Sequence, residues 1–330
     1  TLSLHDALPI SISLVALLGY AITPDSTPHC NQQYLELATL KPGSKATFLC
    51  IDPKEDAGGS FLTGYPLPYT AIPIEECHPV GDSLAVTPLA GEPFTIDRSR
   101  SMGTQERTFL LGTDAYGRDV LSMIMIGSRV SLSVGLIAVL IALLIGITLG
   151  ALAAYHGGWV DNLILWFINV VWSIPTVLLV IAITFALGKG FWQVFIAVGL
   201  TMWVDIARVV RGEVYSLKEK EFVTAGRALG YSSFRIIFRH ILPNIAGAVI
   251  VVTASNFATA ILLEAGLSFL GIGVQPPMPS WGTMVKENYS YILLDSAYLA
   301  LLPGLAIMLI VLAFMLVGNG LRDALDIKEN

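Results

Sequence analysis

Five long stretches of this sequence contain no Asp, Glu, Lys, Arg or His. They cover residues 130–155, 162–188, 190–204, 241–263 and 296–321. A helix of about 20 apolar residues crosses the hydrocarbon core of a bilayer, so four of these stretches are long enough by themselves. The stretch 190–204 must continue through Asp205 and Arg208 to reach that length. With 54% hydrophobic and only 13% charged residues, the chain is not an ordinary soluble domain, and we expect an all-α polytopic membrane protein.

The first 22 residues are expected to hold only part of a membrane span. Residues 1–10, TLSLHDALPI, look like a translated sequencing adapter, and we interpret them as an assembly artefact. Ile10 to Ile22 is apolar but too short to cross a bilayer, so it is interpreted as the remnant of a first transmembrane helix. Together with the five stretches above, the sequence predicts about six transmembrane helices, the first of them truncated.

Residues 23–112 have a different composition, rich in Pro, Gly, Ser and Thr and without helical periodicity. Most of the net charge of −6 lies in this region. Lys45–Ile51 and Pro93–Ile96 predict short strands, and the prolines argue against long ones, at Pro66, Pro68 and Pro73. We expect a small α+β or irregular insertion, because a structureless loop of this length is uncommon.

All three cysteines, Cys30, Cys50 and Cys77, lie in the same region. If it is outside the cytoplasm, one disulfide can form and one thiol is left over. A zinc site is the alternative, because His29 and His78 adjoin two of the cysteines, but the spacing fits no known metal motif.

Residues 221–240 interrupt the apolar stretches with two short amphipathic patterns. Apolar residues recur at i, i+3, i+4 and i+7 in each, first at Phe222, Ala225, Gly226 and Leu229, then at Phe234, Ile237, Phe238 and Ile241. We predict two short helices separated by Gly230, the second capped by Ser232 or Ser233. Pro243 then fits the first turn of the next helix. The simpler interpretation is a charged cytoplasmic loop.

This run resembles the cytoplasmic coupling motif of bacterial binding-protein-dependent ABC transporter permeases. That motif has Glu-Ala-Ala, three residues, Gly, nine residues and Ile-x-Leu-Pro. Its matches here are Ala225, Gly230, Leu242 and Pro243, and the departures are Thr224, Gly226 and His240. The resemblance implies that an ATPase docks on eight residues: Ala225, Gly226, Gly230, Tyr231, Phe234, His240, Leu242 and Pro243.

Three further blocks are similar to C-type dipeptide and oligopeptide permeases. They are Leu111 to Ser122, Trp203 to Gly230, and Glu264 to Gly282. The resemblance covers about 111–327 and implies a permease transmembrane domain at 113–330. It also implies an external gate formed by Glu264, Ser268, Phe269 and Trp281. Without the resemblance, Glu264 would be placed in the lipid headgroup layer at the end of a span.

Inside the apolar stretches, a few residues carry specific predictions. Gly146 and Gly150 have the GxxxG spacing that lets helices approach closely, and Pro175 should kink the span 162–188. Asp205 and Arg208 lie three residues apart, on one helix face. Because an unpaired charge within a membrane is costly, we predict a structural ion pair, with a proton relay as the alternative.

Basic residues set the predicted orientation. Seven Lys or Arg residues lie between Arg208 and Arg239, whereas the loops at 188–190 and 265–295 have one each. By the positive-inside rule the coupling helices at 221–240 are cytoplasmic, and residues 23–112 are outside the cytoplasm. The protein is thus expected in the cytoplasmic (inner) membrane.

No P-loop, H-E-x-x-H or G-x-S-x-G sequence is present, so we expect a transport subunit that catalyses nothing itself and binds no cofactor. The resemblance implies a permease for dipeptides or oligopeptides. Its partners would be a second permease, two ATP-binding subunits and an external solute-binding protein, with no nucleic acid. Nickel chelates are an alternative solute. An ion-coupled secondary transporter and a membrane-embedded hydrolase are alternatives from other classes.

Overall fold

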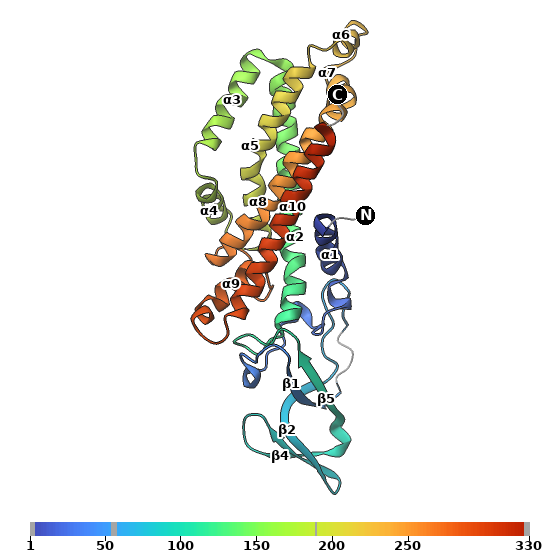
Figure 1. Ribbon diagram of the computed structural model, residues 1–330, viewed down its shortest axis with the longest axis vertical. Coiled ribbons are helices and arrows are strands. Elements are labelled where there is room, and N and C mark those ends of the chain that lie inside the picture. Colours follow the sequence, from blue (N-terminus) through green and yellow to red (C-terminus); the bar gives the residue numbers. More distant parts are fainter. Residues whose placement is uncertain (1–3, 54–57, 189, 327–330) are drawn as a thin grey trace. The chain divides into compact units, whose positions relative to one another are not determined.

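The computed structural model describes residues 4–53, 58–188 and 190–326 (Figure 1). The chain forms two compact units, which we describe separately. The helical unit comprises Thr1–Ser11, Ser131–Gln275 and Ile307–Asn330, and the sheet unit comprises Ile12–Val130 and Pro276–Ala306.

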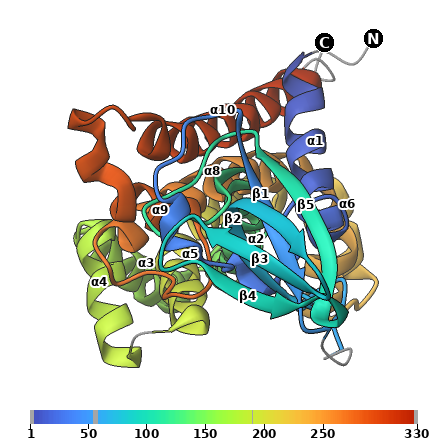
Figure 2. The same cartoon turned by 90° about the horizontal axis from the view of Figure 1, so that it is seen from below.

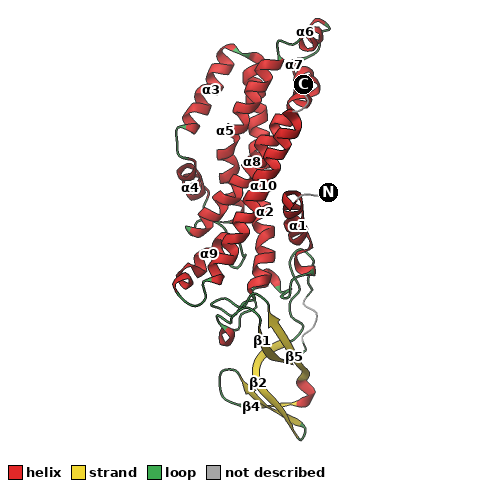
Figure 3. Cartoon of the chain, in the orientation of Figure 1, coloured by secondary structure: helices red, strands yellow, loops and turns green. Residues whose placement is uncertain are grey.

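Helices dominate the chain, as predicted, and Figure 3 shows them in red. Within the described residues, four helices are long and apolar enough to cross a membrane, or five if one bent pair counts as a single span. The four are α2 (Val120–His156), α5 (Phe191–Leu217), the helix Ser233–Phe269 that ends in α8 (Ala246–Phe269), and α10 (Tyr298–Asp326). The predicted remnant of a first span lies in α1 (Leu4–Leu18) and a 3-10 turn (Gly19–Ala21).

The bent pair corresponds to the span predicted to be kinked at Pro175. The structure breaks it into α3 (Gly158–Trp172) and α4 (Thr176–Leu187), whose axes differ by 92°. Pro175 has φ −55° and ψ 124°, which is extended backbone, so the chain leaves the helix at the proline and starts a new one after it. The effect of Pro175 is therefore a complete break, because the proline lacks the N–H that would continue the ladder.

Helix α5 is the centre of the helical unit and packs against α3, α4 and α8. Helix α2 approaches α5 closely at Gly146 and Gly150. A Cβ atom at Gly146 would lie 2.7 Å from Ile206 Cβ, and one at Gly150 would lie 2.5 Å from the Ala207 carbonyl oxygen. The predicted packing role of the GxxxG spacing is confirmed, because nothing larger than hydrogen fits at either position.

The insertion folds into a five-stranded antiparallel sheet of order β4-β3-β2-β1-β5 (Figure 2). Its strands are β1 (Ser44–Ile51), β2 (Thr70–Val80), β3 (Ser83–Pro88), β4 (Phe94–Asp97) and β5 (Ser101–Phe109). The predicted strands at Lys45–Ile51 and Pro93–Ile96 are confirmed as β1 and β4. Adjacent residues of β1 point to opposite faces of the sheet and belong to different hydrophobic clusters. Phe48 packs with Tyr34 and Phe109, and Leu49 packs with Ile74.

The expectation of only short strands was wrong for β2, which has 11 residues and includes Pro73 and Pro79. Residues Thr70 to Ile74 of β2 pair with β1, whereas Ile74 to Val80 pair with β3. Each proline thus lies in a part of the strand that pairs on one side only. A missing N–H can be accommodated there, as it is on an edge strand.

No disulfide forms among the three cysteines, all of which are described and free. Cys30 and Cys50 are buried, and the Cys30 thiol donates to the Asp25 carbonyl oxygen at 3.0 Å. The described residues contain no group of three His, Cys, Asp or Glu side chains arranged to hold a metal.

Candidate functional site

The first predicted coupling helix is α6 (Glu221–Ala228), and it ends in a glycine turn. Gly230 has φ +73°, the left-handed conformation that favours glycine. Its N–H bonds to the Arg227 carbonyl, and the Tyr231 N–H bonds to the Gly226 carbonyl, both at 3.0 Å. These two bonds make a Schellman motif, which satisfies carbonyls that the helix end would leave unpaired. The predicted role of Gly230 is confirmed.

The second coupling helix differs from the prediction because it does not stop before the next span. Helix α7 (Ser233–Ile236) begins with Ser232, whose hydroxyl accepts from the Arg235 N–H, so the predicted cap is confirmed as Ser232. A π-helical turn (Ile237–Ile241) and a 3-10 turn (Leu242–Ile245) then lead directly into α8. Pro243 lies in the first turn of the 3-10 segment, inside a continuous helix. The irregular turns accommodate the proline, whose ring would clash with a regular α-helical carbonyl.

The coupling helices present apolar side chains on their outer surface. Four are exposed, with exposed fractions of 41%, 70%, 68% and 51% at Phe222, Leu229, Phe234 and Phe238. The rings of Phe234 and Phe238 lie 4.3 Å apart, centroid to centroid. These four residues, which we call the coupling patch, are too large and too numerous to be expected on a fully solvated loop.

The opposite side of these helices is anchored in the core of the helical unit. Val223, Ile236 and Ile241 are completely buried and belong to the same cluster as Val210 and Val214 of α5. Since interiors are close-packed, a force on the coupling patch reaches the spans with little local deformation.

The remaining predicted docking residues divide between surface and support. Ala225, Gly230 and Pro243 are exposed, and Tyr231, His240 and Leu242 are half-buried. The Tyr231 and His240 rings stack at 5.8 Å, and the Arg235 guanidinium lies 3.9 Å from the Tyr231 centroid. Gly226 is buried, and a Cβ there would meet Tyr231 at 3.4 Å, an ordinary contact. The departure of Gly226 from the motif's alanine therefore leaves the local packing intact.

Beside the coupling patch lies an apolar cavity of about 330 Å³. Its walls combine Ala151, Leu152 and His156 from the end of α2 with Phe234, Phe238 and Leu242.

A charged pair that the sequence reasoning missed fixes the same end of the unit. Asp161 near the start of α3 accepts two hydrogen bonds from Arg211 of α5, at 2.6 and 2.7 Å. Lys218 Nζ donates to the Ala154 carbonyl at 3.1 Å. Asp161 and Arg211 lie 50 residues apart in the sequence, so spacing alone gave no indication of the pair.

The predicted ion pair between Asp205 and Arg208 does not form. Neither residue belongs to a salt bridge in the described part of the chain, and both side chains are exposed in the helical unit. Arg208 instead lies over the Trp172 ring, 4.1 Å from its centroid. Asp205 lines a cavity of about 140 Å³ together with Trp172 and Thr176, at the break between α3 and α4. The Trp172 ring at the end of α3 attracts the Arg208 guanidinium through a cation–π contact. The prediction considered only residues of the helix that carries Arg208, so it could not include this ring.

Glu264 lies inside α8, not at its end, and is completely buried, so its placement in the headgroup layer was wrong. Its carboxylate accepts from Ser131 Oγ at 3.2 Å and Ser268 Oγ at 2.7 Å. The Ser268 hydroxyl also accepts from the Val274 N–H at 3.1 Å, which fixes the loop after α8. Of the other predicted gate residues, Phe269 is exposed.

The last predicted gate residue, Trp281, lies in the sheet unit at the start of α9 (Trp281–Asn288). Ser280 and Thr283 form a capping box there, and Trp281 Nε1 donates to the Ile124 carbonyl at 3.0 Å. The ring fills the space beside Gly127, where a Cβ would lie 3.1 Å from it. The four predicted gate residues therefore divide between the two units, and Trp281 has a packing role.

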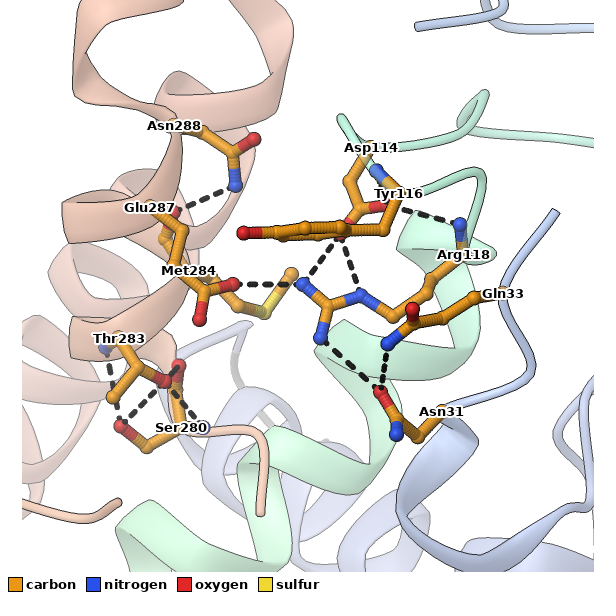
Figure 4. Close-up of polar contacts among 10 residues, drawn as sticks. All are labelled: Asn31, Gln33, Asp114, Tyr116, Arg118, Ser280, Thr283, Met284, Glu287 and Asn288. Atoms are coloured by element: carbon orange, nitrogen blue, oxygen red, sulfur yellow. Dashed lines mark hydrogen bonds and ion pairs between the residues drawn. The ribbon is translucent and has the colours of Figure 1, made fainter. Parts of the chain in front are cut away.

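Arg118 forms a buried polar cluster in the sheet unit (Figure 4). Its guanidinium donates to Asp114 at 2.7 Å, to Glu287 of α9 at 2.7 Å and to Asn31 at 3.4 Å. The ring of Tyr116 covers it at 4.9 Å. One arginine thus joins three segments that are distant in sequence.

Comparison with known proteins gives a family for this architecture. Residues 146–328 match the family model described as a binding-protein-dependent transport system inner membrane component. Among solved structures, an inward-facing form of the MetNI methionine ABC transporter contains a chain with a TM-score of 0.51 and 16% identity. The match covers 62% of this chain and 96% of that one, and shows similarity of fold alone.

Curated relatives are more similar in sequence. A "glutathione transport system permease protein GsiD" of Pectobacterium atrosepticum is 43% identical over 218 residues, which are 66% of this chain and 72% of the relative. A "dipeptide transport system permease protein DppC" of Alkalihalophilus pseudofirmus is 45% identical over 217 residues, 66% of this chain and 71% of the relative.

Proposed function

Because this chain belongs to the family of binding-protein-dependent transport system inner membrane components, we propose that it is one permease subunit of an ATP-driven importer of short peptides. The names of the two relatives point to dipeptides and glutathione, which share a peptide backbone with free termini. Nickel chelates remain a second solute class for the same architecture. The coupling patch is the observation that carries the proposal.

The patch is the docking surface for cytoplasmic ATPase subunits. An exposed aromatic cluster on a short helix fits the groove of a partner, and aromatic residues contribute much of the binding energy at such interfaces. Buried Val223 and Ile236 connect it to the spans. Closure of an ATPase dimer would therefore move the coupling helices as a rigid body and alter the packing of α5 and α8. The chain itself hydrolyses no ATP and requires no cofactor of its own.

The distribution of charge supports the orientation. Arg211, Lys218, Lys220, Arg227 and Arg235 lie at the α5 end and the coupling helices, which we place in the cytoplasm. Because Lys218 donates to the Ala154 carbonyl, the end of α2 belongs to the same side in this proposal. Helix α2 has 37 residues and is thus roughly 55 Å long, more than the hydrocarbon core of about 30 Å. We therefore propose that its start, and the segment 23–112 that precedes it, lie outside the cytoplasm.

The complete importer would contain a second permease, two ATP-binding subunits and an external solute-binding protein. Uptake of labelled L-alanyl-L-alanine into vesicles that contain the reconstituted complex tests the assignment. We expect accumulation only with ATP and with both kinds of partner present. Accumulation by this chain alone, driven by an ion gradient, would instead establish a secondary transporter.

The substitution Phe234→Asp tests the docking surface. Loss of an aromatic anchor costs about 2 kcal/mol or more, which is roughly thirtyfold in affinity. We expect the ATPases to be lost on co-purification while the chain still inserts in the membrane. Leu62→Asp is the matched control, since Leu62 is 70% exposed, close to the 68% of Phe234, but lies in the sheet unit. Equal ATPase recovery from both variants would contradict the docking assignment.

A further inference from the structure

The sheet unit contains a polar cavity that the transport mechanism above does not use. It has a volume of about 300 Å³, and its walls include Asp25, Tyr69, Gln105, Arg107 and Asp119. A second cavity of about 380 Å³ shares Leu67 and Tyr69 with the first. Together they are large enough for a small organic ligand, since ligand pockets begin at about 300 Å³.

Two carboxyl groups line this cavity, and neither forms a salt bridge within the described part of the chain, although the Arg107 cation on the same cavity attracts Asp25 from a longer distance. Asp119 is only 6% exposed, and its Oδ2 accepts from the Ser122 N–H at 2.8 Å. Asp25 Oδ1 accepts from the Thr27 N–H at 2.9 Å. Burial raises the pKa of both carboxyls above the usual value. A carboxylate in such surroundings is costly unless a cation comes to it.

Two buried hydroxyl groups lie beside the charged residues. The Thr27 hydroxyl interacts with the Asp25 carboxylate and the Tyr34 hydroxyl with the Arg107 guanidinium, and both residues are only 6% exposed. Thr27 lines the second cavity. The Tyr34 ring lies 4.8 Å from the Phe48 ring, on which the Arg107 guanidinium also lies at 4.8 Å. These hydroxyls therefore help to hold the carboxylate of Asp25 and the guanidinium of Arg107 in place.

Side chains of both charges line this one cavity, two acids and one arginine. Arg107 donates to the Tyr69 hydroxyl at 3.3 Å and also interacts with the Tyr34 hydroxyl, and a guanidinium has five N–H groups in all. The acids lie on the segments before β1 and before α2, whereas Arg107 lies on β5. No set of three metal-ligating side chains occurs among the described residues, so the donor set suits an organic ammonium group better than a metal.

We propose that this cavity binds a short peptide through its charged termini, the α-ammonium group at Asp25 and Asp119 and the α-carboxylate at Arg107. The assignment rests on the proposed function, because it makes the substrate class of the importer also a ligand of the segment outside the cytoplasm. The hydroxyls of Thr27 and Tyr34 position the two charged side chains that bind the termini. The permease would thus hold the peptide before it enters the membrane.

Equilibrium dialysis tests the site directly. The full chain with its partner permease, in lipid nanodiscs without ATP or binding protein, is equilibrated with labelled L-alanyl-L-alanine. We expect saturable binding, and about tenfold to a hundredfold weaker competition by N-acetyl-alanyl-alanine, which lacks the ammonium group, and by alanyl-alanine amide, which lacks the carboxylate. Competition by either analogue equal to that of the free dipeptide overturns the proposal.

A pair of protein variants completes the test. Asp25→Asn keeps the acceptor for the Thr27 N–H but removes the charge, and should weaken dipeptide binding at least tenfold. Asp82→Asn changes an exposed carboxyl of the same unit and should have no effect. Unchanged binding in Asp25→Asn also overturns the proposal. Absence of binding together with intact ATP-driven uptake rejects only this site, whereas dipeptide binding without ATP-driven uptake rejects only the importer assignment.

Discussion

The close approach of α2 and α5 gives the sharpest stability prediction, through the substitution Gly150→Ala. The new Cβ would lie 2.5 Å from the Ala207 carbonyl oxygen and 3.0 Å from Val210 Cβ. Ordinary contacts begin at 3.4 Å, so the two helices must separate by about 0.9 Å at this point. The obstacle is a backbone atom, which cannot rotate away as a side chain can.

The expected magnitude follows from two opposing effects. Overpacking costs about 1–3 kcal/mol, and a backbone clash belongs at the upper end of that range. Alanine in place of glycine in a helix regains about 1 kcal/mol. The free energy of unfolding should therefore fall by about 2 kcal/mol, which lowers the unfolding temperature by roughly 4–8 °C.

The matched control is Gly212→Ala in α5, where a Cβ would meet nothing within 4 Å. There only the helix propensity changes, so the unfolding temperature should rise slightly. Thermal unfolding of both variants in detergent, followed by loss of the monodisperse chromatographic peak, measures the difference. If Gly150→Ala is as stable as Gly212→Ala, the helices are not in direct backbone contact, and the packing described for the helical unit is wrong.

Two further predictions concern buried charges in the sheet unit. Arg118→Gln leaves Asp114 and Glu287 without their shared partner, so the sheet unit should lose about 3 kcal/mol and the amides of α9 should exchange hydrogen faster; unchanged exchange would refute the role of the cluster. The pKa of Asp25 is raised in the folded state, mainly by burial, so its contribution to stability is complete below its unfolded pKa and is lost as pH rises through the folded value. Asp25→Asn should therefore raise the unfolding temperature relative to the wild type more at about pH 7.5 than at about pH 4. An equal difference at the two pH values would show that the carboxyl titrates normally.

Local sequence was sufficient wherever the decisive interaction is itself local. Gly230 ends α6 because its conformation requires no side chain, and Ser232 caps α7 through a bond three residues away. The GxxxG spacing of Gly146 and Gly150 predicted close packing, although not the identity of α5 as the partner. In these cases the physical cause lies within one turn of helix.

Prediction failed where a residue chooses between neighbours that only folding supplies. Arg208 was assigned to Asp205, three residues away, but its contact is Trp172 on another helix. Asp161 and Arg211 were not connected at all, because 50 residues separate them. Pro73 was interpreted as evidence against a long strand, and the divided pairing of β2 makes the proline acceptable.

By itself the sequence determined that this chain spans a membrane as helices and carries two short amphipathic helices between its spans, because apolar length and helical periodicity are properties of the chain alone. The tertiary structure decided which charges pair, how deeply Glu264 is buried, and that Asp25, Asp119 and Arg107 line one cavity. The physical reason is that the free energy of a buried charge or hydroxyl depends on the groups that surround it in space. For these residues the surroundings come from segments far away in the sequence.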